Sequence, residues 1–159
     1  MSGRAPPQRL RLPLLDRLMD DRPDRLEEEP LKLSEAMDRL RLSVRRDLEA
    51  LLNARRRRWP LPARAPELAL SPLGYGIPDA TAGSYALPER REALALEVER
   101  MIRRFEPRLH AVKVTLREGG DELDRTLRLR VDALLHAEPI SFETLIEAVS
   151  HEVRVAERG

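Results

Sequence analysis

The sequence predicts an α+β domain with two main helices packed on a small antiparallel sheet of three to four strands, preceded by a short N-terminal docking helix. Two long segments repeat apolar residues every three or four positions, which is typical of helices with one buried face. Two later segments alternate apolar and polar residues, which is typical of strands with one buried face. Because these strands follow one another instead of alternating with helices, the pattern indicates the α+β class.

The chain divides into a short N-terminal region and one domain. Its 159 residues suffice for one hydrophobic core, though not for two comfortable ones. We predict a tail, a short amphipathic helix and a linker over residues 1–30, and a single domain over residues 31–159. In the first region, Pro13 suits the first turn of a helix that places Leu14, Leu15 and Leu18 on one side. So short a helix does not fold alone, so it either packs back on the domain or docks on another protein.

The first long helix is predicted from apolar residues at spacings of three and four, namely Leu33, Met37, Leu40, Val44, Leu48, Leu51 and Leu52. Ser34 or Ser43 would suit a helix start, so the pattern fits either one helix or two. The arginine run 55–58 would favour the negative end of the helix dipole in a last turn, and Pro60 stops the helix.

The second long helix has an apolar stripe of Leu94, Val98, Met101, Ile102 and Phe105, and Pro88 lies near its start. Residues 59–88, between the two helices, are rich in proline and glycine and have no sustained period. Within them, Gly74 and Gly76 permit backbone angles closed to other residues, and Pro78 fixes its own. This combination predicts a specified turn.

A β-hairpin follows the second helix. Val112, Val114 and Leu116 alternate with polar residues, EGGDELD (118–124) turns the chain, and residues 127–133 alternate again. Two further strand candidates are ISFETLI (140–146), which helix periodicity also fits in part, and EVRVAE (152–157).

Composition excludes several classes of protein. The chain has no cysteine, which excludes a disulfide scaffold, and its net charge of +1 argues against nucleic-acid binding by bulk electrostatics. No apolar run approaches the roughly 20 residues that span a bilayer, and the N-terminus lacks the features of a signal peptide. We therefore expect a cytoplasmic protein without membrane insertion.

Chemistry-bearing residues form no recognisable catalytic or metal site. Glu106 is a candidate for carboxylate catalysis, with Asp79, Asp121 or Glu138 as nominal partners, but spacing supports no pair among 28 acidic residues. The histidines at positions 110, 136 and 151 lack metal-ligand spacing, and no serine lies in a glycine-framed elbow. We expect no catalytic residue, cofactor, metal or small-molecule substrate.

The stretch Glu106-Pro107-Arg108 lies where the second helix gives way to the first strand. Proline pushes the residue before it towards an extended conformation, and residues two apart in an extended chain point to the same side. Glu106 and Arg108 would then form a rigid patch of two charges for a partner. Equally, each charge would pair with a nearby helix inside the monomer. The sequence leaves both alternatives open.

Several segments come in a familiar order: SVRRDLEALLNARR (43–56), YGIPD (75–79), the helix running into FEPRL (105–109), and the strands VKVTL (112–116) and LRLRV (127–131). Together they resemble the small wedge subunit of contractile injection machines, a family that includes the type VI secretion baseplate component TssE and relatives in contractile-tailed phages. The early LLDRL (14–18) is similar to the secretion branch. The resemblance covers most of residues 12–156. One residue departs from the pattern, since Gly74 stands where asparagine is usual.

The resemblance implies a non-catalytic assembly protein of a baseplate at the inner face of the inner membrane. Its partners would be other wedge proteins and the tail sheath, whose first ring would add strands to the edges of this sheet. The expected partner-binding residues are Glu106, Pro107, Arg108, Leu14, Leu15, Leu18, Tyr75, Pro78 and Asp79. The alternatives are a peptidoglycan-cleaving, lysozyme-like hydrolase using Glu106, because some phage members carry a lysozyme label, and a generic cytoplasmic adaptor.

Overall fold

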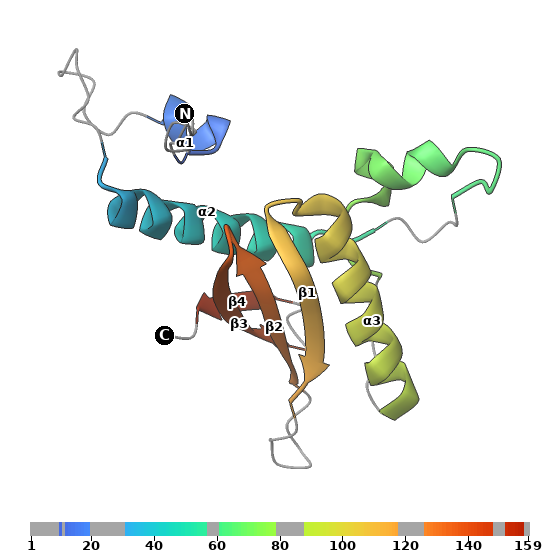
Figure 1. Ribbon diagram of the computed structural model, residues 1–159. Helices are drawn as coiled ribbons and strands as arrows, with labels where there is room; N and C mark the ends of the chain where they lie inside the picture. The colour runs from blue at the N-terminus through green and yellow to red at the C-terminus, as the bar shows by residue number, and fades with distance from the viewer. Residues whose placement is uncertain are drawn as a thin grey trace, which may run out of the picture. The chain divides into compact units, whose positions relative to one another are not determined.

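The computed structural model describes residues 10, 12–19, 31–56, 61–78, 88–117, 126–147 and 152–157. The described helices and strands are, in chain order, α1 (Leu14–Leu18), α2 (Leu33–Asn53), η1 (Pro66–Leu70), η2 (Pro72–Gly74), α3 (Pro88–Phe105), β1 (Leu109–Leu116), β2 (Leu127–Leu135), β3 (Glu138–Ile146) and β4 (Val153–Glu157) (Figure 1). The chain forms two compact units, residues 1–44 and 45–159, which we describe separately. The predicted division at residue 30 stays a prediction.

The first unit contains α1, which confirms the predicted short helix. The helix begins after Pro13, whose carbonyl oxygen accepts a hydrogen bond from the backbone N–H of Arg17 at 3.1 Å. No residue of α1 is buried, and Leu14, Leu15 and Leu18 expose 68%, 53% and 71% of their surface. These leucines are therefore available to a partner.

α2 is one continuous helix, which decides between the one-helix and two-helix alternatives. Its start is capped by the carboxylate of Glu35, which accepts a hydrogen bond from Lys32 N at 3.3 Å. Ser43 is buried inside the helix and so does not begin a second one. The predicted apolar stripe is buried except for its first member, Leu33, which is exposed.

The end of α2 differs from the prediction. The helix stops at Asn53, so the arginine run lies beyond its last turn. The reason is a competing partner for the backbone: Ile77 N donates to Ala54 O at 3.0 Å, and Arg56 N donates to Ile77 O at 2.9 Å. These hydrogen bonds form a short parallel bridge between the chain leaving α2 and the YGIPD segment.

The loop before α3 is pinned at two glycines, as the sequence predicted for this turn. Gly76 has a φ of 96°, and a Cβ added there would lie 2.4 Å from Ala54 O. A Cβ added at Gly74 would lie 2.2 Å from Ala69 O, because the 3-10 helix η1 packs against it. The glycine that departs from the pattern of the resembled family therefore fits a close backbone approach in this chain.

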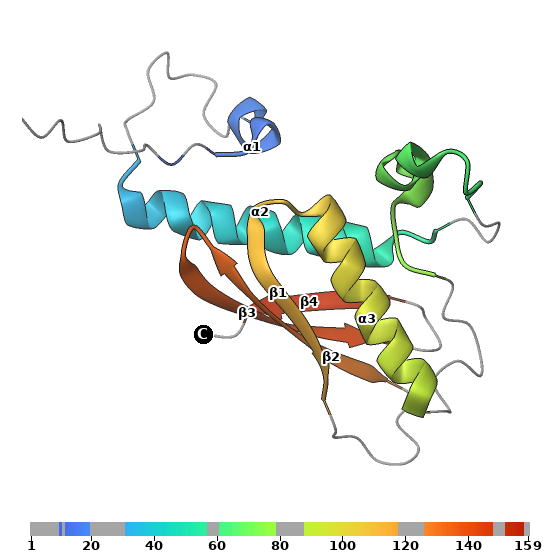
Figure 2. The same cartoon turned by 45° about the vertical axis from the view of Figure 1, so that its right-hand side comes forward.

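α3 follows the predicted apolar stripe and lies beside β1 (Figures 1 and 2). Val98, Met101 and Ile102 are buried, and Ala95 joins them. Leu94 and Phe105 are half-buried at the margins of the stripe.

The four strands form one antiparallel sheet in the order β1-β2-β3-β4. This confirms the predicted hairpin and both further strand candidates, and it shows that residues 140–146 belong to a strand. Buried and exposed residues alternate along β2 and β3, so one face of the sheet lies in the core. Phe142 is fully buried on that face.

Two backbone irregularities lie at the same end of β1 and β2. Ala111, with a φ of 49°, interrupts the register between His110 and Lys113 as a β-bulge. The turn from β2 to β3 has only two residues, His136 and Ala137, and both have positive φ. That conformation matches the type I′ turn, whose twist suits the strands it joins.

We expect Gly76→Ala to lower the free energy of unfolding by about 2 kcal/mol or more, because alanine at positive φ is strained and its Cβ would meet the Ala54 carbonyl. Urea denaturation followed by circular dichroism measures the change. Ala63→Gly, at an exposed position of the same loop, is the control and should cost less than about 1 kcal/mol. Equal losses in the two variants would contradict the proposed strain at Gly76.

Candidate functional site

The Glu106-Pro107-Arg108 segment forms a tight turn between α3 and β1. Glu106 N donates the last helical hydrogen bond, to Ile102 O at 2.8 Å. Leu109 N then donates to Glu106 O at 3.1 Å, which reverses the chain across Pro107. Proline suits this position because the turn requires no hydrogen bond from its nitrogen.

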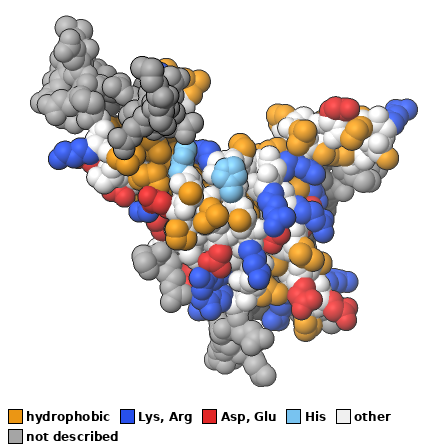
Figure 3. Space-filling view, in the orientation of Figure 1, with side chains coloured by type: hydrophobic (Ala, Val, Ile, Leu, Met, Phe, Trp, Pro, Cys, Tyr) orange, Lys and Arg blue, Asp and Glu red, His pale blue; other side chains and the backbone are white. Residues whose placement is uncertain are grey.

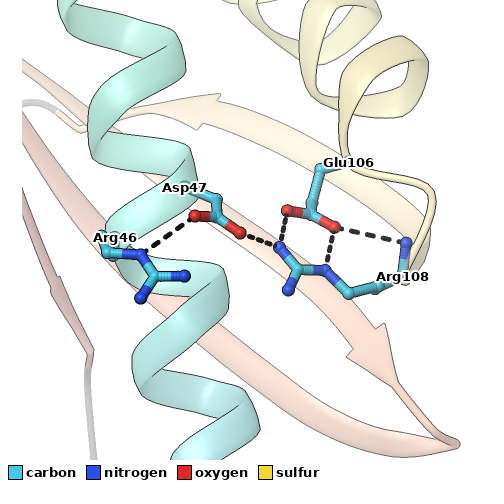
Figure 4. A network of polar contacts seen from close by, with 4 residues as sticks. All are labelled: Arg46, Asp47, Glu106 and Arg108. Atoms are coloured by element: carbon cyan, nitrogen blue, oxygen red, sulfur yellow. Dashed lines mark hydrogen bonds and ion pairs between the residues drawn. The ribbon is translucent and has the colours of Figure 1, made fainter. Parts of the chain in front are cut away.

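The side chains of this turn meet in an ion-pair network (Figure 4). Arg108 Nε donates to Glu106 Oε1 at 2.5 Å, and Arg108 Nη2 donates to Glu106 Oε2. The same Nη2 donates to Asp47 Oδ2 on α2 at 2.5 Å, and Arg46 Nε donates to Asp47 Oδ1 at 3.2 Å. One guanidinium group therefore joins the turn to α2.

The network runs from the interior to the surface. The side chain of Glu106 is only 5% exposed, that of Arg108 is 24% exposed, and that of Asp47 is 38% exposed. The hydrogen bond with Glu106 raises the pKa of Arg108 above its ordinary value, although burial opposes the shift. Both members of the Glu106–Arg108 pair are needed, because a buried charge without its partner is strongly destabilising.

For Glu106, the structure decides between the two alternatives that the sequence left open. Its carboxylate faces inward and is held by Arg108, so the charges pair inside the molecule. The expectation that both charges form an exposed patch fails for Glu106, because its side chain is buried and bound by Arg108. Arg108 is partly accessible at the outer side of the pair, so contact of this turn with a partner is a proposal that concerns Arg108 and Pro107.

The YGIPD segment lies next to the same network. The Tyr75 ring packs edge-on against Phe105, the last residue of α3, with the ring centroids 5.2 Å apart and an interplanar angle of 77°. Burial raises the pKa of the Tyr75 hydroxyl, and the carboxylates of Asp47 and Glu106 raise it further. Two motifs that are distant in the sequence thus meet at one place.

The remaining predicted site residues lie elsewhere. Pro78 is half-buried at the end of the pinned loop, and Asp79 lies outside the described residues. Leu14, Leu15 and Leu18 belong to the first unit. Sequence reasoning missed Asp47, whose only signal is a carboxylate beside the apolar stripe of α2, and it missed Asn53, which lies at the end of that helix.

The edge of β1 is occupied by side chains of α3. The Val112 carbonyl oxygen accepts a hydrogen bond from Arg103 Nη2 at 2.6 Å, and Val114 N donates to Glu99 Oε2 at 3.0 Å. Arg103 and Glu99 are themselves an ion pair at 2.8 Å. This pair takes the main-chain groups that a neighbouring strand would use at Val112 and Val114.

Among the described residues, a side chain of α2 binds the start of the β4 edge. Glu147 N donates to Glu152 O at 3.2 Å, so by the antiparallel alternation residues 153, 155 and 157 turn their main-chain groups away from β3. Asn53 satisfies the first of them: its Nδ2 donates to Val153 O at 2.8 Å, and its Oδ1 accepts from Val153 N at 2.9 Å. No described residue forms a hydrogen bond with the outward main-chain groups of Val155.

The described surface does not suggest a metal site or a membrane span. Among the described residues, no group of three or more His, Asp or Glu side chains is arranged to hold a metal ion. None of the described helices is both long enough and apolar enough to cross a bilayer. Positive and negative side chains are interspersed on the face of the molecule that Figure 3 shows.

We expect Arg108→Leu to lower the free energy of unfolding by about 3–5 kcal/mol, because it leaves the Glu106 carboxylate buried without a partner. Glu106→Leu combined with Arg108→Leu should recover much of that loss, since an apolar pair replaces an ion pair at low cost. Urea denaturation measures both variants. Arg100→Leu, which removes an exposed ion pair with Glu97 on α3, is the control and should cost less than about 1 kcal/mol. If Arg108→Leu alone lost no more free energy of unfolding than this control, the ion-pair network would not stabilise the fold.

Comparison with protein families gives one match: residues 38–140 match the family described as baseplate wedge protein gp25. The matched residues include most of α2, the pinned loop, α3, the Glu106-Pro107-Arg108 turn and the first two strands. A search of curated proteins finds no match.

Proposed function

Because the chain belongs to the baseplate wedge protein gp25 family, we propose that it is the wedge subunit of a contractile type VI secretion baseplate, where it links the other wedge proteins to the first ring of the tail sheath and starts sheath assembly. Family membership gives the chain a structural role in a baseplate. The secretion system, the sheath contact and the inner face of the inner membrane as its place are the finer parts of this proposal.

The main-chain groups of β4 that face away from β3 are our proposed site for the sheath contact. An unpaired strand edge is a risk for aggregation unless a partner covers it. A partner strand that adds to the edge gains affinity from main-chain hydrogen bonds and specificity from alternate side chains. No described residue hydrogen-bonds the outward main-chain groups of Val155, which is itself buried, whereas side chains of α3 bind those of Val112 and Val114 on the opposite edge.

The exposed leucines of α1 support the contact with another wedge protein. Leu14, Leu15 and Leu18 are three large apolar side chains on a helix of five residues, and all three are exposed. A helix with apolar anchors at this spacing suits an apolar groove on a partner. The outer side of Arg108, with Pro107 and the Tyr75–Pro78 segment beside it, is the second proposed contact.

The arrangement of Glu106 favours an assembly role over peptidoglycan cleavage. A general acid must reach the glycosidic oxygen, but both oxygens of Glu106 accept hydrogen bonds from Arg108 and the side chain is buried. Of its nominal carboxylate partners, Asp79 and Asp121 lie outside the described residues. We therefore propose that the protein is not an enzyme and that Glu106 positions Arg108.

We expect Leu14→Ser with Leu18→Ser to abolish co-purification with the other wedge proteins while the melting temperature stays unchanged, because both leucines are exposed. Co-expression with an affinity-tagged wedge partner measures the loss. Leu42→Ser with Leu96→Ser is the matched control, since those leucines are 55% and 54% exposed on other helices. If the α1 variant co-purifies as well as the control, α1 does not dock on a wedge protein.

The purified protein should leave a turbid suspension of peptidoglycan unchanged, because the candidate acid Glu106 is buried and bound by its own arginine. Light scattering over several hours measures this, with lysozyme as the positive control. Clearing by the wild-type chain that is lost in Glu106→Gln, a variant with the same shape, would instead establish the hydrolase.

A further inference from the structure

The outward face of α3 carries charges that are placed symmetrically about Leu96. Glu89 and Glu92 precede this leucine by seven and four residues. Arg100 and Arg103 follow it by four and seven residues. Residues at spacings of three, four and seven lie on one face of a helix. Along this face, two acids therefore lie on one side of a central leucine and two bases lie on the other.

The side chains of this face are accessible, and its acids have no partner among the described residues. Glu89 and Glu92 are exposed, and no described residue forms a hydrogen bond or an ion pair with either carboxylate. Leu96 exposes 54% of its surface. The side chains of Arg100 and Arg103 are 64% and 58% exposed. One exposed leucine needs no explanation, but the equal spacing of opposite charges on its two sides does.

The helix dipole explains part of this pattern. It favours an acid in the first turn and a base in the last turn, where Glu89 and Arg103 lie. The dipole acts along the helix axis, so it does not select one side of the helix, and its effect falls off beyond the terminal turns. Glu92 and Arg100 lie further from the ends and on the same side as Leu96. The dipole leaves their placement unexplained.

We infer that the free chain forms a weak dimer in which two copies of α3 pack antiparallel, with Leu96 against Leu96 on a two-fold axis. Such an axis makes one face complementary to itself. It brings Glu92 of each copy opposite Arg100 of the other copy. It also brings Glu89 of each copy opposite Arg103 of the other, so every one of these contacts joins opposite charges. This inference does not depend on the proposed function.

The two arginines are able to bind a second carboxylate without releasing their present partners. A guanidinium group has five N–H donors. Arg100 uses Nη1 to bind Glu97. Arg103 uses Nε and Nη2 to bind Val112 O, and Nη2 also binds Glu99. Carboxylates of a second copy therefore add to the bonds within the chain.

The dimer is weak because the face is small. From Glu89 to Arg103 it spans about 21 Å, at 1.5 Å per residue. A single helix face of this length is at the low end of interface size. Exposed ion pairs each contribute little and are screened by salt. We therefore expect dimers at high protein concentration and low ionic strength.

Sedimentation velocity on the full chain tests the dimer, at concentrations up to about 1 mM and in about 20 mM salt. The association constant of the wild type should fall about tenfold or more in about 500 mM salt. Glu92→Arg and Arg100→Glu should each lower it by about tenfold or more, because each turns two attractive contacts into like-charge contacts. An equal mixture of these two variants should dimerise again, because each exchanged charge then faces its opposite.

Arg90→Glu is the matched control. It changes the net charge by as much as Arg100→Glu does, and Arg90 is also exposed on α3. Its position is one residue after Glu89, about 100° away around the helix and outside the face. This variant should dimerise like the wild type. The melting temperature should be the same in all three variants, since all three side chains are exposed.

Each outcome supports or overturns the inference. A wild-type chain that stays monomeric over this range overturns it. If the wild type dimerises and Glu92→Arg and Arg100→Glu dimerise equally well, α3 is not the surface. If the two variants stay monomeric when mixed, the antiparallel pairing is wrong. If the wild type is monomeric and both variants, but not Arg90→Glu, lose co-purification with a wedge protein, that protein and not a second copy occupies this face.

Discussion

The second unit depends on one guanidinium group. Arg108 is bonded to Glu106 within its own turn and to Asp47 on α2, so a single side chain joins the helix that precedes the loop to the junction of α3 and β1. A lysine would not serve as well, because its single ammonium lacks the planar donors that meet two carboxylates at fixed angles. The ion pair lies where α3 ends and β1 begins.

Two further contacts hold the loop between α2 and α3 near the Glu106-Pro107-Arg108 turn. The chain after α2 bonds to Ile77, and the Tyr75 ring rests against Phe105. Both contacts require the backbone to pass close to its neighbours, which is why glycines lie at positions 74 and 76. The motif residues for which the resemblance implies partner contacts therefore also make contacts inside the molecule. A substitution among them changes the internal packing as well as any contact with a partner.

The two edges of the sheet are treated differently. On β1, an ion pair from α3 binds the main chain at Val112 and Val114. On β4, one amide binds Val153, and no described residue hydrogen-bonds the outward main chain of Val155, which is buried. In both cases polar side chains bind main-chain groups that a neighbouring strand would use, which protects the free sheet from indiscriminate pairing.

The sequence by itself determined the elements. The periods of apolar residues located both long helices and the two strands of the hairpin, because burial of one face imposes a period of 3.6 or 2 wherever the element lies, and they marked the last two strands only as candidates. Glycine and proline located the pinned loop, because each of them sets the backbone angles available at its own position. Only the tertiary structure decided that α2 ends at Asn53, that Glu106 is enclosed, and that Asp47 and Asn53 belong to the site. Each of these depends on hydrogen bonds between residues distant in the chain, such as Asn53 with Val153, and such pairings leave no periodic trace in one sequence.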